Sequence, residues 1–288
     1  MKGNTIRKIS PYLYVAPALA LAFLFCYKPF FLAVLDSLYH VSQNGKLLRF
    51  VGFDNYRILF ASDSFRDSWR NTLTFTALFV PVNLVVTLFL SFACNYASKT
   101  AKVAKIVLLL PMAVAMSSAV LLFKTIFDEN LGILNGLLGS RIPWFSNGTD
   151  AMWMLVFTGV WLDVGFDFLL FSSSLSNIPQ NLEEVADLEG ASFLQRLRYL
   201  EIPMIAPTLV FVLANNIKDA MLISAPVMIL TEGGPYRSTQ TLVYQMYLEG
   251  FKSGNIAIGS AIATVVFFVT FLFLLLILAF QKRRVFYQ

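Results

Sequence analysis

Ionisable side chains lie inside two long apolar segments of this sequence. Asp163 and Asp167 fall between Met152 and Leu175, and the segment from Met204 to Leu230 carries Asn215, Asn216, Lys218 and Asp219. A spacing of four residues places Asp163 and Asp167 on one face of a helix. Carboxylates in such surroundings can pair with a cation, exchange a proton or accept hydrogen bonds from hydroxyl groups.

Two interpretations of these polar residues stay open. An ionised group at the centre of a bilayer costs about 2.5 to 3.5 kcal/mol, so in a membrane these side chains should face protein or water. They could form a structural pair between Lys218 and a carboxylate, with hydrogen bonds between helices. They could instead line a path for a polar solute, since Trp161, Phe166 and Phe168 beside the carboxylates suit stacking on sugar rings. Both interpretations require an inward-facing polar strip.

Motifs of enzymes and ATPases are missing from the sequence. Gly45-Lys46 lacks the following Ser or Thr of a phosphate-binding loop. No H-E-x-x-H, C-x-x-C or G-x-S-x-G motif occurs, His40 is the single histidine, and Cys26 and Cys94 lie in apolar runs. We therefore predict no catalytic residue, no metal site and no cofactor bound by this chain, which should not hydrolyse ATP by itself.

The composition indicates an integral membrane protein. Hydrophobic residues make up 57% of the 288 residues and charged residues 14%, well below the roughly 25% usual in soluble domains. The net charge of +5 is better explained by Lys and Arg kept on the cytoplasmic side than by nucleic-acid binding, which we do not expect.

Six segments reach the roughly 20 apolar residues that a membrane-spanning helix needs. They run from Tyr12 to Leu35, Thr72 to Asn95, Ile106 to Phe127, Met152 to Leu175, Met204 to Leu230 and Ala257 to Phe280. The sequence therefore predicts an all-α, polytopic membrane protein, in contact with lipid and forming a single transmembrane domain over residues 1–288. The first segment continues past a signal-like Ala20-Leu21-Ala22, which favours an uncleaved anchor.

The distribution of basic residues predicts the orientation. Lys and Arg are denser at one set of segment ends, at Lys2, Arg7, Lys8, Lys99, Lys102, Lys105, Arg196, Arg198, Lys282, Arg283 and Arg284. The positive-inside rule places these ends in the cytoplasm. Both termini and the stretch from Asn177 to Pro203 should then be cytoplasmic.

The stretch from Asn177 to Pro203 is polar, with apolar runs on both sides. Leu182, Val185 and Ala186 share one helical face, Gly190 interrupts, and a second face follows at helical spacing. Two short helices with a turn at Gly190 are therefore predicted, as a cytoplasmic elbow. Its leading acidic residues would be repelled by an anionic membrane surface, which favours docking on a protein over lying in the interface.

This stretch resembles the cytoplasmic signature of permease subunits of binding-protein-dependent ABC importers. That signature reads E-A-A, three residues, G, nine residues, then I-x-L-P. Here Glu184-Val185-Ala186 is followed by Gly190 and then by Leu200-Glu201-Ile202-Pro203, so the spacing matches. Segments similar to the sugar-importing branch, of the maltose and glycerol-phosphate type, are Phe50 to Tyr56, Asn71-Thr72-Leu73, Trp161 with Gly165-Phe166, Asn177-Ile178-Pro179, Leu230 to Pro235 and Tyr244 to Phe251.

The resemblance implies an importer for a mono- or oligosaccharide or a related polyol or glycerol-phosphate solute, in a bacterial or archaeal plasma membrane. Its partners would be a second homologous permease, two ATPase subunits that hold ATP and magnesium, and an extracytoplasmic solute-binding protein. ATPase coupling would fall to Glu184, Val185, Ala186, Gly190, Ala191 and Leu197. The substrate path would include Asp163, Gly165, Asp167, Phe168, Asn216, Asp219 and Ser224.

One departure from the family bears on the solute. Many relatives carry Phe-Asp shortly before the Leu-Thr-x-Gly-Gly-Pro segment, where this chain has Ser224-Ala225-Pro226, so the identity of the solute does not transfer. The alternatives are a secondary transporter that uses Asp163, Asp167 or Asp219 as a proton or sodium site, and a membrane enzyme. An inverted repeat would favour the first, and a nucleophile with its base would favour the second.

Overall fold

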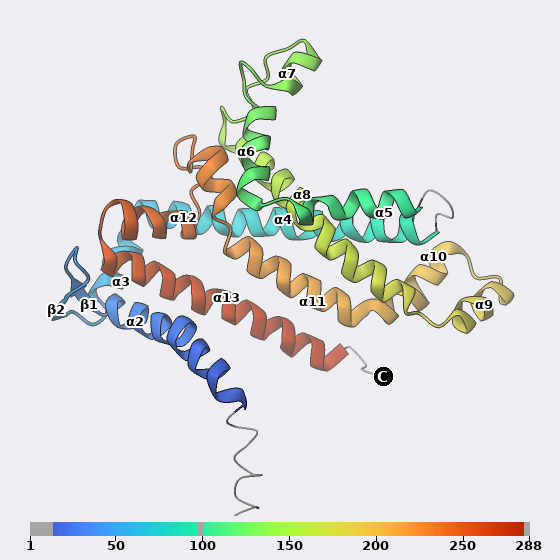
Figure 1. Ribbon diagram of the computed structural model, residues 1–288, viewed down its shortest axis with the longest axis horizontal. Coiled ribbons are helices and arrows are strands. Elements are labelled where there is room, and N and C mark those ends of the chain that lie inside the picture. Colours follow the sequence, from blue (N-terminus) through green and yellow to red (C-terminus); the bar gives the residue numbers. More distant parts are fainter. Residues whose placement is uncertain (1–13, 97–100, 285–288) are drawn as a thin grey trace, which may run out of the picture. The chain divides into compact units, whose positions relative to one another are not determined.

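The computed structural model describes residues 14–96 and 101–284, which are mostly helical (Figure 1). Among these residues, five helices are long and apolar enough to cross a membrane, or six if one bent pair is a single span. They are Tyr14–Ser37, Asp63–Tyr96, Gly148–Ser176, Phe193–Met221 and Ile256–Ala279, with the pair Lys102–Ala113 and Met116–Ile126. The predicted all-α, polytopic class is confirmed. Tyr12, Lys2, Arg7, Lys8, Lys99 and Gln288 lie outside the described residues.

The chain divides into two compact units, and the first comprises the residues up to Ser62 together with Met246–Val265. Its first helix contains the π-turn η1 (Phe23–Tyr27) and continues as α2 (Lys28–Ser37). An antiparallel hairpin follows, β1 (Tyr39–Val41) and β2 (Leu47–Phe50), and then α3 (Asp54–Ala61). The buried Asn55 ties these elements together, because its Nδ2 donates to the carbonyls of Ser37 at 2.8 Å and Tyr39 at 2.9 Å.

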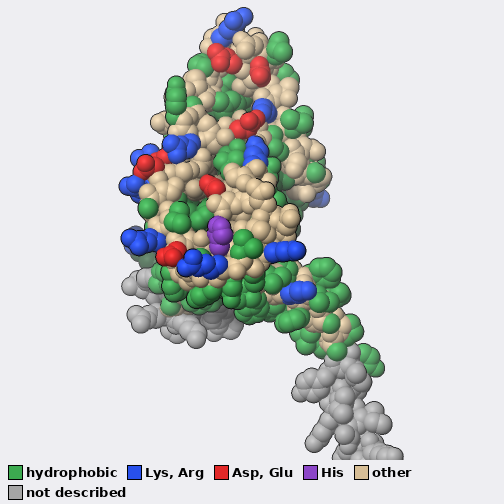
Figure 2. Space-filling view, turned by 90° about the vertical axis from the view of Figure 1, so that its left-hand side faces the viewer, with side chains coloured by type: hydrophobic (Ala, Val, Ile, Leu, Met, Phe, Trp, Pro, Cys, Tyr) green, Lys and Arg blue, Asp and Glu red, His purple; other side chains and the backbone are tan. Residues whose placement is uncertain are grey.

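The helix from Tyr14 to Ser37 exposes its hydrophobic side chains. The apolar window of this helix has no buried residue, and Tyr14, Leu19 and Phe25 are among its most exposed side chains. In Figure 2 the part of the chain next to the grey residues is covered mainly by hydrophobic side chains. A surface of this kind is suited to lipid or to another membrane protein rather than to water.

Two glycines allow a close approach in the same unit. Gly250 lies in the π-turn η5 (Leu248–Lys252), and Gly259 lies near the start of α13 (Ile256–Arg284). A Cβ added at Gly259 would lie 2.8 Å from the Cα of Gly250, so a side chain there would force the two backbones apart.

The second unit, Asp63–Gln245 with the residues from Val266, is built around three helices: α4 (Asp63–Tyr96), α8 (Gly148–Ser176) and α11 (Ile202–Met221). These helices pack against one another in each pairing (Figure 1). Phe171, Leu175 and Ile205 are fully buried in their core. Buried hydroxyls on α4 donate to the carbonyl four residues back, at 2.7 to 2.8 Å, as in Thr72, Thr87 and Ser91. These hydroxyl groups therefore lie inside the bundle with their donors paired to the backbone of their own helix.

Shorter elements complete the chain. They are α5 (Ala101–Leu109), the 3₁₀ turn η2 (Leu110–Ala113), α6 (Met116–Ile126), α7 (Ile133–Leu138), α9 (Gln180–Leu188), α10 (Phe193–Arg196), the π-turns η3 (Leu197–Glu201) and η4 (Val227–Thr231), and α12 (Leu242–Tyr247).

Two predicted spans differ from the structure. The segment from Ile106 to Phe127 is not one helix, because the chain bends by 103° between η2 and α6. Pro111 has no N–H for the helical ladder, and Val114 and Ala115 are extended. The predicted span from Met204 to Leu230 ends early, since α11 stops at Met221 and η4 begins only after Pro226.

Candidate functional site

The elbow predicted between Asn177 and Pro203 is present, and Gly190 makes its turn. Helix α9 ends in a Schellman motif: the N–H of Gly190 donates to the carbonyl of Asp187 at 3.1 Å, and that of Ala191 to Ala186 at 3.0 Å. Gly190 has φ +71°, a left-handed conformation that other residues adopt only at a cost. The spacing from Ala186 to Gly190 and Ala191 therefore follows from helix termination.

The second half of the elbow starts with its own cap. Ser192 and Gln195 form a capping box, in which the N–H of Ser192 donates to Oε1 of Gln195 at 2.7 Å. Helix α10 then passes into η3, and Pro203 lies in the first turn of α11, where its missing N–H is harmless. The elbow is thereby continuous with a membrane-crossing helix.

Four large, mainly apolar side chains project from the elbow and are mostly exposed in the described chain. Val185 is 51% exposed, Leu188 88%, Leu194 71% and Tyr199 73%. We call these four residues the apolar ridge. A water-facing elbow would be polar, so the ridge indicates a surface that another molecule covers.

The residues predicted to couple the chain to an ATPase occupy different places. Glu184 is exposed, with no hydrogen bond or ion pair to the described residues, and Val185 belongs to the apolar ridge. Ala186, Gly190 and Ala191 build the turn. Leu197 instead packs on the buried cluster of Phe171, Leu175 and Ile205.

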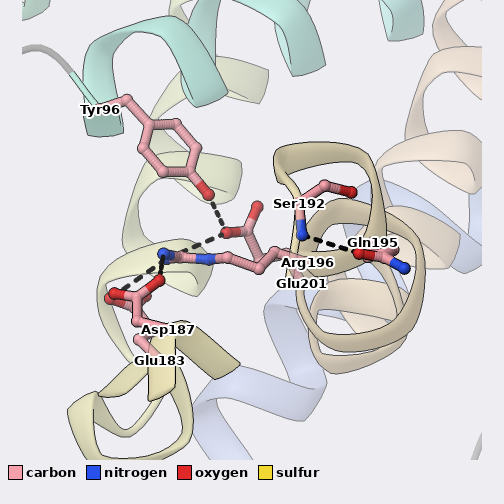
Figure 3. A network of polar contacts seen from close by, with 7 residues as sticks. All are labelled: Tyr96, Glu183, Asp187, Ser192, Gln195, Arg196 and Glu201. Atoms are coloured by element: carbon pink, nitrogen blue, oxygen red, sulfur yellow. Dashed lines mark hydrogen bonds and ion pairs between the residues drawn. The ribbon is translucent and has the colours of Figure 1, made fainter. Parts of the chain in front are cut away.

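An arginine inside the elbow gathers acidic residues from two elements, in a network that we call the Arg196 hub (Figure 3). Arg196 Nη1 lies 2.6 Å from Oδ1 of Asp187, and Nη2 lies 3.9 Å from both Glu183 Oε2 and Glu201 Oε1. The hydroxyl of Tyr96 donates to the same Oε1 of Glu201. Because Tyr96 is the last residue of α4, the hub connects that helix to α9 and to the start of α11.

The burial of Glu201 makes the hub dependent on all of its partners. Glu201 is 1% exposed, and its Oε2 has no partner in the described chain. Arg196 also lies over the ring of Tyr96, 5.7 Å from its centroid. A buried carboxylate stays tolerable only while its cation and its hydrogen-bond donor remain in place. In the sequence Arg196 indicates only the orientation of the chain, because Tyr96 lies a hundred residues away from it.

A cavity of about 210 Å³ lies among α4, α6, α8 and α11. It is lined by Phe75, Phe79, Met116, Gly159, Leu162, Asp163, Asp219, Ala220, Leu222, Ile223, Ser224 and Pro226. The rings of Phe75 and Phe79 are stacked at 5.3 Å with an interplanar angle of 10°. A Cβ at Gly159 would approach Phe79 to 3.0 Å, so this glycine leaves room for the rings.

The two carboxylates of the cavity are in different states of pairing. Asp219 lies 3.1 Å from Lys218 Nζ, and Asn215 Nδ2 donates to it at 2.8 Å. Asp163 has no hydrogen bond or ion pair with any described residue. The structural pair considered for Lys218 therefore exists, and it leaves Asp163 free.

Four residues of the predicted substrate path lie away from this cavity. Asp167 is fully buried and accepts from Asn83 Nδ2 at 2.7 Å. Asn216 lies next to Asp167 without a hydrogen bond of standard geometry, and Phe168 is in the core. Gly165 packs against α5 and η2, where a Cβ would lie 2.8 Å from Met112 Cγ. Asp163, Asp219 and Ser224 are the predicted path residues that line the cavity.

Comparisons with known proteins agree on one family. The model described as "Binding-protein-dependent transport system inner membrane component" matches residues 8–286. The sn-glycerol-3-phosphate transport system permease protein UgpA of Salmonella typhi is 32% identical over 282 residues, covering 96% of each chain. The UgpA of Escherichia coli O157:H7 is likewise 32% identical, with the same coverage.

Solved structures share the fold. A bacterial ABC transporter involved in the import of the acidic polysaccharide alginate superposes with a TM-score of 0.88 at 19% identity, over 98% of both chains. The alginate transporter in complex with an alginate pentasaccharide-bound periplasmic protein gives 0.86, over 97% of this chain and 96% of the other. On the near-complete match of the family model, the chain belongs to the family of binding-protein-dependent transport system inner membrane components.

Proposed function

We propose that this chain is the permease subunit of an ATP-driven importer for a saccharide or a related polyol. It would pair with a second, homologous permease, with two ATPase subunits and with an extracytoplasmic solute-binding protein. The observation that carries this proposal is the elbow, where the apolar ridge lies on a turn fixed by Gly190 and anchored by the Arg196 hub. The relative named for sn-glycerol-3-phosphate transport and the structure named for alginate import support a solute of the polyol or saccharide class.

The distribution of basic residues supports the orientation in this proposal. With the elbow and both termini in the cytoplasm, the cavity lies within the helices that cross the membrane. It would form this chain's half of the translocation path, and the second permease would supply the other half.

Coupling in this proposal is mechanical. ATP binding closes the two ATPase subunits, and the ridge moves with the cleft in which it sits. The Arg196 hub passes that movement to α4 and α11, because Tyr96 ends the first helix and Glu201 immediately precedes the second. The helix bundle has two states, and movement of its cytoplasmic end shifts the equilibrium towards the state in which the path is open at the other end.

The test is reconstitution of the complete importer in proteoliposomes, with the solute-binding protein outside and ATP inside. Radiolabelled saccharides should accumulate only with both ATP and the binding protein. Uptake driven by a proton or sodium gradient, without ATP, would instead establish the secondary transporter that uses the aspartates.

A further inference from the structure

The charge of the cavity limits which solutes can occupy it. Asp163 and Asp219 both face it, and Lys218 lies beside it. Lys218 is engaged by Asp219 and also donates to Asn215 Oδ1 at 2.8 Å. Lys218 therefore pairs directly with Asp219, and Asp163 faces the cavity without an ion pair or hydrogen bond to a described residue.

The rest of the lining adds no cation. Apart from the two carboxylates and Ser224, the described residues around the cavity are apolar or glycine, and the stacked Phe75 and Phe79 form one side. Such walls do not screen a charge as water does, so the field of Asp163 extends across the cavity. The buried Asp167, one helical turn from Asp163, contributes a second negative charge near the cavity.

We infer that this cavity accepts hydroxyl- or amino-bearing saccharides and rejects anionic ones such as uronates and sugar phosphates. This inference rests on the proposed function and narrows its solute class. Asp163 accepts hydrogen bonds from hydroxyl groups or pairs with an ammonium group, while the phenylalanine rings contact the apolar face of the sugar. An anionic solute would have to displace water next to an unpaired carboxylate, with no basic side chain of the lining to meet it.

The sign of the electrostatic potential in the cavity can be measured without knowing the solute. The purified importer would carry Ser224→Cys in a background of Cys26→Ala and Cys94→Ala, and would react at pH 8 with cationic or anionic methanethiosulfonate reagents of similar size. The ratio of the two rates, divided by the ratio for a small free thiol, reports the potential at the cavity. Because Ser224 is a lining residue, the probe leaves both carboxylates in place.

We expect the cationic reagent to be favoured about tenfold, since a unit charge within several ångströms in a medium less polar than water changes local ion concentration by about that factor. Asp163→Asn should reduce the preference at least about threefold. The matched control is Asp150→Asn, the same charge change in the first turn of α8, about 20 Å away along the helix. It should leave the ratio unchanged. A ratio equal to that of the free thiol, or one that Asp163→Asn leaves unchanged, would overturn the inference.

Uptake separates this inference from the proposed function. Proteoliposomes with the complete importer would be offered a neutral trisaccharide, a glucosamine oligomer, an oligouronate and glycerol phosphate. ATP-dependent uptake confined to the neutral or amino sugars supports both proposals. Efficient uptake of an anionic solute would refute the inference and leave the importer assignment standing. Failure of every solute, with the cationic preference intact, would count against the importer assignment alone.

Discussion

Replacing Arg196 by Gln removes the cation that Glu183, Asp187 and Glu201 share. The contact with Asp187 is short, but this carboxylate is 64% exposed, so its loss costs about 0.5 kcal/mol. The loss at Glu201 is larger, because that side chain is 1% exposed and keeps only the Tyr96 hydroxyl. Removing one partner of a buried pair costs about 3 to 5 kcal/mol; at 3.9 Å, with Tyr96 retained, we expect about 2 kcal/mol here.

That loss should lower the thermal unfolding midpoint of the purified importer by about 5 °C. It should also lower the amount of solute transported per ATP hydrolysed, because the elbow loses its tie to α4, while the ATPase subunits still co-purify. Arg196→Lys, which keeps the charge, should recover part of both.

The matched control is Arg198→Gln, two residues away. Arg198 is exposed, and the contact it makes in the described chain is with the ring of Tyr199 at 5.6 Å. This variant should leave the free energy of unfolding within about 0.5 kcal/mol of that of the unaltered importer. The amount of solute transported per ATP hydrolysed should stay within about twofold. If Arg196→Gln matched this control in both measurements, the hub would have no role in stability or in coupling.

Three further predictions concern single positions. Gly190→Ala should destabilise the elbow by about 1 kcal/mol through its φ of +71° alone, since a Cβ there meets nothing within 4 Å. Gly136→Ala in α7, with equal room and no positive φ, should instead leave the same thermal melt unchanged or stabilise the protein by up to about 1 kcal/mol. Gly165→Ala should cost about 1 to 3 kcal/mol, because its Cβ would lie 3.0 Å from the carbonyl oxygen of Leu108, and an unchanged melting midpoint would show that α5 shifts freely. A cysteine at Gln180 should resist impermeant reagents in intact cells while one at Ser146 is labelled, and external labelling at Gln180 would reverse the assigned topology.

Local signals in the sequence were sufficient for the elbow. Gly190 marks its turn, and the prolines at either end mark helix starts, because each acts through its own backbone. The third span shows the limit of hydropathy, which registers apolar length and ignores the backbone. Pro111 was visible in the sequence, but its effect depends on the extended residues that follow it.

Contacts between distant parts of the chain were beyond the sequence. Asp163 and Asp167 were correctly placed one turn apart, yet one faces the cavity and the other is buried against Asn83, a partner on α4. The Arg196 hub likewise depends on how α4 ends next to the elbow. The periodicity of the sequence indicates which residues share a face of a helix. Which other helix or cavity that face meets depends on tertiary packing, which the periodicity does not contain.

Photo-crosslinking from the tip of the elbow tests the central claim most directly. A photoreactive residue in place of Leu188, which is 88% exposed on the apolar ridge, would be activated in the assembled importer. The account predicts one dominant product that joins this chain to an ATPase subunit, and loss of that product when Gly190→Asp distorts the turn. Products with lipid alone, in an importer that still transports with ATP, would contradict it.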